Sequence, residues 1–239
     1  MRRIAVAAAV AAAMLGAAAF AARTTGTVTE PETGKTFETS RDFGGKPHTL
    51  IGVGAFEAFG AVDVYAAGFY LDTEAAGRSW QRFLERQAAS FVHDGAVDWA
   101  ALKNSSTLYQ WIYSGSFGKG IQIKMVRSVT RQQVIDLHTD VMRRLVDDFD
   151  NAVQQPPLKD YVDATCRDGQ DGDELEIWTR GSTIFVRSSR YGQTRIENAS
   201  SIIRAVWQLW FGASPIQVPL RRELVEHLEN LGGPAAAAE

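Results

Sequence analysis

Cysteine is almost absent from this chain of 239 residues, which contains only Cys166. A single cysteine excludes an intrachain disulfide and a metal site built from several cysteines. An excess of positive charge is also missing, because 25 basic residues face 28 acidic ones and the net charge is −3. Since nucleic-acid binders usually present a basic face, we expect no nucleic-acid partner.

One long uncharged run stands at the N-terminus. Residues 4–22 follow Arg2 and Arg3, carry no charge and end in small residues, among them Ala19-Phe20-Ala21. This pattern is typical of a secretory signal peptide that is cleaved near Ala21. The alternative is an uncleaved N-terminal helix that anchors the protein, since 19 residues can just span a bilayer. Twelve of the 19 are alanine, which is weakly apolar, so we favour cleavage and a periplasmic or secreted protein.

The rest of the chain has the composition of a globular protein. It holds 6 Trp, 6 Tyr and all of the chain's 12 Phe except Phe20, and these need a hydrophobic core, which excludes a disordered chain. No repeat and no linker divides the sequence, so we expect one domain over residues 22–231 and a disordered tail over residues 232–239.

Apolar spacing predicts a mixture of strands and helices. The run from Ala61 to Leu71 is apolar on both alternating faces apart from Asp63, which is typical of a central strand covered on both sides. Phe59 and Gly60 belong to its hairpin connection with a preceding strand. We predict strands at 27–29, 35–37, 49–53, 61–71, 121–130, 175–180 and 183–189, and helices at 74–89, 99–113, 131–151, 198–211 and 219–231.

Arg127 has an unusual position within the predicted strand at 121–130. Alternation along that strand puts Arg127 on one face with Ile123, Met125 and Val129. The arginine either extends to the sheet edge or to an acidic partner, or it lines a cavity. In the second case its charge, held in a region of low dielectric constant, would bind an anion strongly.

Motifs of common active sites are incomplete. Gly52-x-Gly54 lacks the third glycine and the following helix of a dinucleotide fingerprint, and Gly118-Lys119-Gly120 lacks the spacing of a phosphate loop. Asp136, His138 and Asp140 do not share one helix face, and the acids from Asp168 to Asp173 miss the alternation of a calcium loop. We therefore expect no metal and no cofactor.

Three stretches, taken together and in order, resemble the chalcone isomerase family. Leu50–Leu71 (LIGVGAFEAFGAVDVYAAGFYL) resembles its glycine-rich strand, hairpin and second strand. Lys124–Val134 (KMVRSVTRQQV) resembles its middle strand and following helix, and Ile196–Leu224 (IENASSIIRAVWQLWFGASPIQVPLRREL) resembles its late helix and terminal helix. The segment TVTEPETGKTF at residues 27–37 is similar to that of exported bacterial chalcone isomerase-like proteins.

This resemblance implies an α+β open-faced sandwich, in which a curved antiparallel sheet carries a layer of helices on one face. It also implies a ligand cavity between sheet and helices. Plant members of the family close a chalcone to a flavanone, whereas fatty-acid-binding relatives hold a carboxylate lipid with the same arginine and tyrosine.

The positions of the family's catalytic residues are largely apolar in this chain. The arginine position falls at Phe56 and the threonine position at Tyr65, while the remaining polar positions fall at Val134, Val141 and Ile202. Ring closure of a chalcone needs a cation and hydroxyl donors in a dry site, and the loss of one such donor costs on the order of 100-fold in rate. No catalytic residue is therefore expected.

The resemblance predicts a non-catalytic protein that binds a hydrophobic small molecule or fatty acid. The residues expected to contact the ligand are Phe56, Tyr65, Phe69, Met125, Arg127, Ile202 and Val206. One alternative is an isomerase of the intramolecular lyase type, acting on a chalcone-like enone with Tyr65, Tyr70 and Arg127. Another is a structural or partner-binding envelope protein with a filled pocket, whose protein partner is unknown. Each of these hypotheses is compatible with a protein that lies at the periphery of a membrane.

Overall fold

The computed structural model describes residues 26–58 and 62–232. The expected signal peptide at 1–21, the connection at Phe59 and Gly60, and the expected tail beyond Gly232 lie outside the described residues. Within the described ranges, no helix combines the length and the apolar character that are needed to cross a bilayer.

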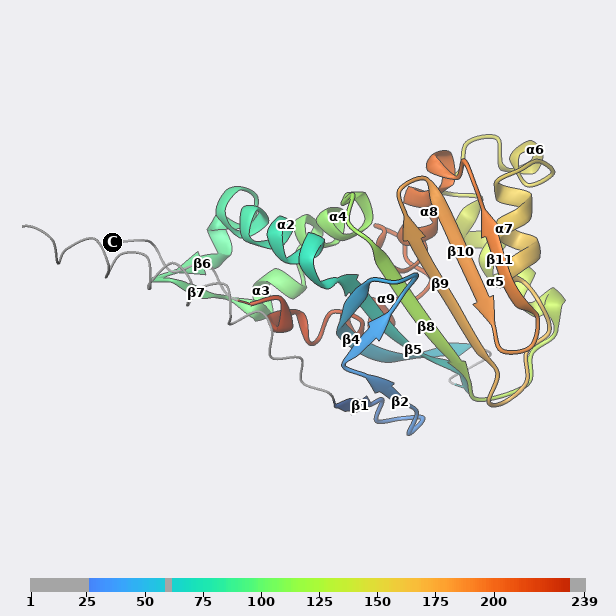
Figure 1. Ribbon diagram of the computed structural model, residues 1–239, viewed down its shortest axis with the longest axis horizontal. Coiled ribbons are helices and arrows are strands. Elements are labelled where there is room, and N and C mark those ends of the chain that lie inside the picture. The colour runs from blue at the N-terminus through green and yellow to red at the C-terminus, as the bar shows by residue number, and fades with distance from the viewer. Residues whose placement is uncertain (1–25, 59–61, 233–239) are drawn as a thin grey trace, which may run out of the picture.

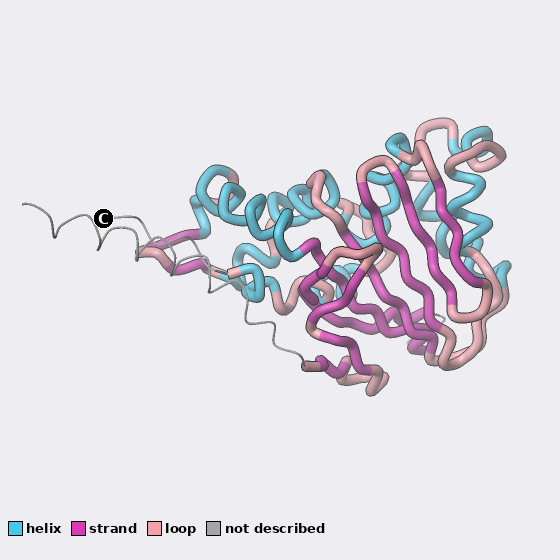
Figure 2. The backbone as a smooth tube through the Cα atoms, in the orientation of Figure 1, coloured by secondary structure: helices cyan, strands magenta, loops and turns pink. Residues whose placement is uncertain are grey.

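Seven strands form one antiparallel sheet in the order β11-β10-β9-β8-β5-β4-β3 (Figures 1 and 2). The strand predicted to be central, β5, indeed lies between β4 and β8. The strands of this sheet are β3 (Ser40–Asp42), β4 (Pro47–Ala58), β5 (Val62–Asp72), β8 (Lys119–Met125), β9 (Glu174–Arg180), β10 (Thr183–Ser188) and β11 (Gly192–Ile196). Two short strand pairs lie outside it: β1 (Thr27–Thr29) with β2 (Thr36–Glu38), and β6 (Val92–His93) with β7 (Ala96–Val97).

Helices cover one face of the sheet and build the main hydrophobic core with it (Figure 1). They are α2 (Thr73–Arg86), α3 (Trp99–Lys103), α4 (Ser106–Ser114), α5 (Arg131–Met142), α6 (Phe149–Ala152), α7 (Leu158–Thr165), α8 (Ser200–Phe211) and α9 (Val218–Glu223). Two 3-10 helices are formed by Ala89–Phe91 and Leu228–Leu231. The predicted α+β class, with a curved antiparallel sheet and one helical layer, is confirmed.

Local sequence explains where several helices begin and end. The Asp72 side chain accepts hydrogen bonds from the backbone N–H groups of Glu74 and Ala75, so it caps α2 at its N-terminus. Helix α8 ends at Phe211, the predicted last residue, and Gly212 is its C-cap. Its N-cap is Ala199, and Asn198, where the helix was predicted to begin, has a positive φ of 55° instead.

A carboxylate contact shows how strongly the sheet curls. Glu176 on β9 is buried and accepts hydrogen bonds from Arg187 on β10 and from Arg41 on β3. Four strand steps separate β9 from β3 in the sheet, about 19 Å if the sheet were flat. The Arg41 side chain can reach Glu176 only because the sheet bends its two halves towards each other.

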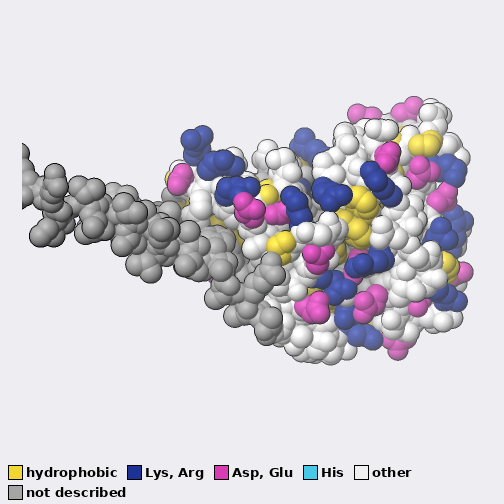
Figure 3. Space-filling model, viewed as in Figure 1, with side chains coloured by type: hydrophobic (Ala, Val, Ile, Leu, Met, Phe, Trp, Pro, Cys, Tyr) yellow, Lys and Arg dark blue, Asp and Glu magenta, His cyan; other side chains and the backbone are white. Residues whose placement is uncertain are grey.

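The concave face of this curl carries a second hydrophobic cluster. Phe43 contacts Trp178 and Tyr70, with ring centroids 5.8 and 5.5 Å apart, and Trp178 stacks on Phe185 at 5.1 Å. Arg187 lies over the Trp178 ring. In the space-filling view of this side, basic and acidic side chains alternate around a small apolar area (Figure 3). The N-terminal strands therefore cover part of the face that an open-faced sandwich leaves bare.

The predicted helix at 131–151 is shorter than expected. Helix α5 ends at Met142, and after a turn Asp148 adopts a left-handed conformation with φ of 49° before α6 begins. The short helix α7 was not predicted at all, although Leu158, Tyr161, Val162 and Thr165 recur at helical spacing and are buried. Its eight residues directly follow two prolines, and so short a helix gives a weak periodic signal.

Candidate functional site

The two aromatic residues at the family's arginine and threonine positions stack on each other. The ring centroids of Phe56 and Tyr65 are 4.9 Å apart and the ring planes differ by 17°. Both side chains are buried on the side of the sheet that faces the helices. This packing gives hydrophobic contact where an enzyme of the family would need a charged donor.

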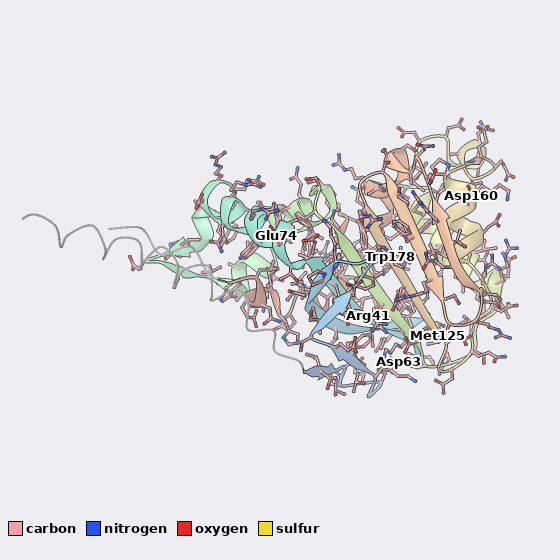
Figure 4. The ribbon with its side chains drawn as sticks, in the orientation of Figure 1. Arg41, Asp63, Glu74, Met125, Asp160 and Trp178 are labelled. Carbon is pink, nitrogen blue, oxygen red and sulfur yellow. The ribbon has the colours of Figure 1, made fainter. Side chains whose placement is uncertain are left out.

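An apolar cavity lies between the sheet and helices α5 and α7. Its volume is about 90 Å³, small beside the few hundred Å³ typical of pockets for drug-sized ligands. Figure 4 shows Met125 at the end of β8, and Asp160 on helix α7 behind the sheet. The apolar part of the lining is formed by Val64, Tyr65, Ile123, Met125, Val129, Val134, Leu137, Ala164 and Leu175.

Two polar side chains of this lining, Tyr65 and His138, are uncharged. Burial raises the pKa of Tyr65, so its hydroxyl stays protonated and can donate. Burial lowers the pKa of His138, whose Nδ1 lies 3.0 Å from the carbonyl oxygen of Val134. Because that oxygen can only accept, Nδ1 carries the proton and Nε2 of the neutral ring is an acceptor. Three carboxylates also line the cavity, and two of them have cationic partners: Asp173 pairs with Arg190 and Glu174 with Lys124, while Asp168 is exposed. This wall suits an apolar or hydrogen-bonding ligand better than a buried anion.

Arg167 is the one cation among the residues that line this cavity. Its guanidinium lies 5.0 Å from the ring centroid of Tyr191, and its Nε donates to the Asp163 carbonyl oxygen over 2.8 Å. The Arg167 side chain is exposed, so its charge stands at the opening rather than at the inner wall. A shallow depression of about 400 Å³ shares Arg167, Asp168 and Tyr191 with the cavity and adds Arg131.

The structure brings only part of the expected binding set together. Tyr65 and Met125 line the cavity, whereas Phe56, Phe69, Ile202 and Val206 do not. These four side chains are buried in the core; Phe69, for example, packs on Phe211 with ring centroids 4.4 Å apart. The expectation that all seven residues share one cavity wall is corrected accordingly.

The predicted position of Arg127 is wrong. Strand β8 ends at Met125, where its ladder with β5 stops at the Tyr65 pair, and the chain then bends. Arg127 lies in this bend and is exposed, because strand alternation no longer applies beyond Met125. Arg127 is not among the residues that line the cavity.

The alternative enzymatic set is not assembled either. Tyr65 belongs to the core on the helical face, whereas Tyr70 belongs to the cluster on the concave face. Five residues apart on one strand, they point to opposite sides of the sheet. Together with the exposed Arg127, they cannot surround one substrate.

The acidic residues considered as metal ligands have separate partners. Asp168 accepts from the backbone N–H of Arg131 over 2.6 Å, and Asp171 pairs with Lys35 at 3.1 Å. In the part of the chain that the structure describes, the carboxylates of Glu32, Glu57 and Asp63 come closest to a metal-binding group, within 4.8 Å of one another. Two of the three are exposed, as acidic surface groups commonly are without an ion.

Several lining residues were not predicted from the sequence. Leu137 and His138 lie on the predicted amphipathic helix, but Ala164 and Arg167 belong to α7 or follow it, and Tyr191 lies in the turn before β11. The spacing within α7 was the signal that could have located this wall.

Comparison with solved structures finds a similar fold in the fatty-acid binding protein AtFAP1 of Arabidopsis thaliana, with a TM-score of 0.63. The superposition covers 86% of this chain and 99% of AtFAP1. This chain therefore has the chalcone isomerase-like fold. Sequence identity to AtFAP1 is 14%, so the likeness shows the fold alone. No protein-family model and no curated protein matches the sequence.

Among the described residues of this chalcone isomerase-like fold, the positions that correspond to the family's catalytic residues are apolar or aromatic, and an apolar cavity lies beside Tyr65. Tyr65 and His138 supply neutral donors and acceptors, and Arg167 is accompanied by the carboxylates of Asp168, Asp173 and Glu174. Such an arrangement can hold an amphipathic molecule with its apolar part inside.

Proposed function

We propose that this protein binds a hydrophobic carboxylic acid, such as a fatty acid or an aromatic acid, without chemical turnover. The observation that carries the proposal is the apolar cavity with Arg167 at its opening. The apolar part of the ligand lies between the sheet and helices α5 and α7, and the carboxylate lies outside against Arg167. The similarity of the fold to a fatty-acid binding protein supports this class of ligand.

The energetics favour this orientation. Each buried methylene group contributes about 0.8 kcal/mol to binding, whereas a carboxylate buried at a neutral wall would lose its hydration without compensation. A long acyl chain exceeds the present cavity, so its binding requires the half-buried Met125 side chain to move. Methionine is suited to this because its unbranched side chain has several low-energy conformations.

The direct test is mass spectrometry of an organic extract from natively purified protein. We expect about one equivalent of a lipid or aromatic acid per chain. An empty extract, together with no binding of added fatty acids, would contradict the proposal and favour a filled core with a partner-binding role. Export is part of the proposal and rests on residues 2–21; the intact mass of the same sample would show whether the mature chain begins at Ala22.

Replacing Arg167 with methionine is expected to weaken binding of a fatty acid roughly two- to fivefold, because an exposed ion pair contributes up to about 1 kcal/mol. The methyl ester of the same acid should bind both proteins equally, since it carries no charge. Titration with a fluorescent fatty acid, and competition by the ester, would measure both effects.

Arg127→Met is the matched control, because Arg127 is also exposed but does not line the cavity. Its affinity for the acid should equal that of the unchanged protein. Weaker binding by Arg127→Met but not by Arg167→Met would contradict the placement of the carboxylate against Arg167.

A further inference from the structure

A second candidate site lies at the opposite end of β8, around Lys119. This lysine is 2% exposed. Its Nζ donates to the carbonyl oxygens of Gly115 over 2.5 Å and Phe117 over 3.3 Å, and it lies 4.8 Å from the centroid of the Phe117 ring. Six residues along a strand separate Lys119 from Met125, about 20 Å, so this site is distinct from the apolar cavity.

Lys119 differs from every other lysine of the chain. The sequence contains six lysines, and all of them lie within the described residues. The other five, Lys35, Lys46, Lys103, Lys124 and Lys159, each pair with a carboxylate at 2.5 to 3.9 Å. Among the described ion pairs none involves Lys119, so its amine has only neutral partners.

Lys119 is one of the residues that line a pocket of about 350 Å³. Polar side chains from three other segments share this wall: Ser114 and Ser116 at and after the end of α4, Thr179 on β9, and Ser200 and Arg204 on α8. The Arg204 guanidinium lies 5.2 Å from the ring centroid of Tyr113, which also lines the pocket. Arg204 itself is exposed, so the pocket pairs a buried amine with a cation at its rim.

Burial lowers the pKa of Lys119 to about 7, so a large fraction of the amine is neutral at physiological pH. A neutral amine has two N–H bonds and one lone pair. The two carbonyl oxygens of Gly115 and Phe117 match the two N–H bonds, which leaves the lone pair free to act as a nucleophile.

We propose that Lys119 forms an imine with a small aldehyde or ketone that carries a carboxylate or phosphate group. Arg204 binds the anionic group at the rim, and Nζ attacks the carbonyl carbon inside the pocket. A C=N double bond replaces the C=O bond, and the carbonyl oxygen leaves as water with both hydrogens of the neutral amine. A proton taken up from solvent converts the imine to its protonated form, whose N–H donates to the carbonyl oxygen of Gly115. This site is independent of the fatty-acid function proposed above.

The test is reductive trapping on the full chain at pH 7. Pyridoxal 5′-phosphate and cyanoborohydride are added, and the labelled lysines are quantified by peptide mass spectrometry. We expect Lys119 to be labelled at least tenfold faster than the five ion-paired lysines. Lys119→Met should remove this fast labelling, whereas Lys124→Met should leave it unchanged.

Arg204→Met separates a built site from a merely reactive amine, and it should fold normally because Arg204 is exposed. It should slow labelling by pyridoxal 5′-phosphate about tenfold but leave labelling by pyridoxal, which lacks the phosphate, unchanged. Glyoxylate, an aldehyde with a carboxylate, should compete with pyridoxal 5′-phosphate for Lys119 and slow its labelling. Labelling of Lys119 no faster than that of Lys103 would overturn the proposal, as would an equal effect of Arg204→Met on both pyridoxal probes.

Discussion

Replacing Gly52 with alanine is expected to destabilise the protein by about 3 kcal/mol. An added Cβ would lie 2.2 Å from the carbonyl oxygen of Glu223 and 2.5 Å from the carbonyl carbon of Leu224. Both atoms belong to the backbone, which cannot rotate away as a side chain can. The C-terminal segment would have to move off β4 as a whole.

Such a movement would break further contacts. The backbone N–H of His227 donates to the carbonyl oxygen of Ile51 over 2.7 Å, and the Asn230 side chain donates to that of Leu50 over 3.1 Å. Each hydrogen bond contributes about 1 kcal/mol, and overpacking of a core costs typically 1–3 kcal/mol. A loss of about 3 kcal/mol lowers the melting temperature of a chain of this size by roughly 6–12 °C.

Urea unfolding and thermal melts of Gly52→Ala would measure the effect. Gly26→Ala is the control, because an added Cβ there would have no contact closer than 3.7 Å, to Thr39. A loss below about 1 kcal/mol for Gly52→Ala would show that the C-terminal segment shifts freely. Gly52 thus allows close packing of two backbone segments, whereas Gly54 lies against the side chains of Glu223 and Leu220.

Filling the apolar cavity is expected to abolish most of the fatty-acid binding. Val134 on α5 is half-buried and lines the cavity, so the ring of Val134→Phe would occupy the space proposed for the ligand. Excluding two or three methylene groups of the ligand costs about 2 kcal/mol, which weakens binding roughly 30-fold. Titration with a fluorescent fatty acid would measure this loss.

Val146→Phe provides a matched control, because Val146 is equally half-buried beside the core but does not line the cavity. It introduces the same ring and should leave the affinity unchanged. Melting temperatures of both variants would show whether either has a disturbed fold. Equal affinity of Val134→Phe and Val146→Phe would place the ligand elsewhere in the molecule.

The sequence was sufficient to predict those strands and helices that depend on neighbouring residues. The apolar run at β5 predicted a central strand, and the strands predicted at 175–180 and 183–189 correspond to β9 and β10, which pair as a hairpin. The helix predicted at 74–89 corresponds to α2, which buries Trp80, Phe83 and Leu84 at helical spacing. These elements are long or strongly periodic, so neighbouring residues alone carry the signal.

Pairing and packing decided what the sequence left open. Strand β8 ends at Met125 because its pairing with β5 stops there, and this removes Arg127 from the expected cavity wall. The helix predicted to run to residue 151 ends at Met142, and the unpredicted α7 takes its place beside the sheet. Which strand or helix lies opposite a residue depends on contacts distant in sequence, which no local pattern encodes.

The candidate sites show the same division. The sequence led us to expect no intrachain disulfide, because it has one cysteine, and no nucleic-acid partner, because its charge is balanced. Apolar residues at the family's catalytic positions led us to expect none of the family's chemistry. Only the tertiary structure brings Tyr65, His138, Arg167 and Tyr191 together around one cavity. It also decides that Lys119 is buried. The physical reason is that cavities and desolvated charges arise where separate elements meet, and the sheet's curl and the helices' packing set those meeting points.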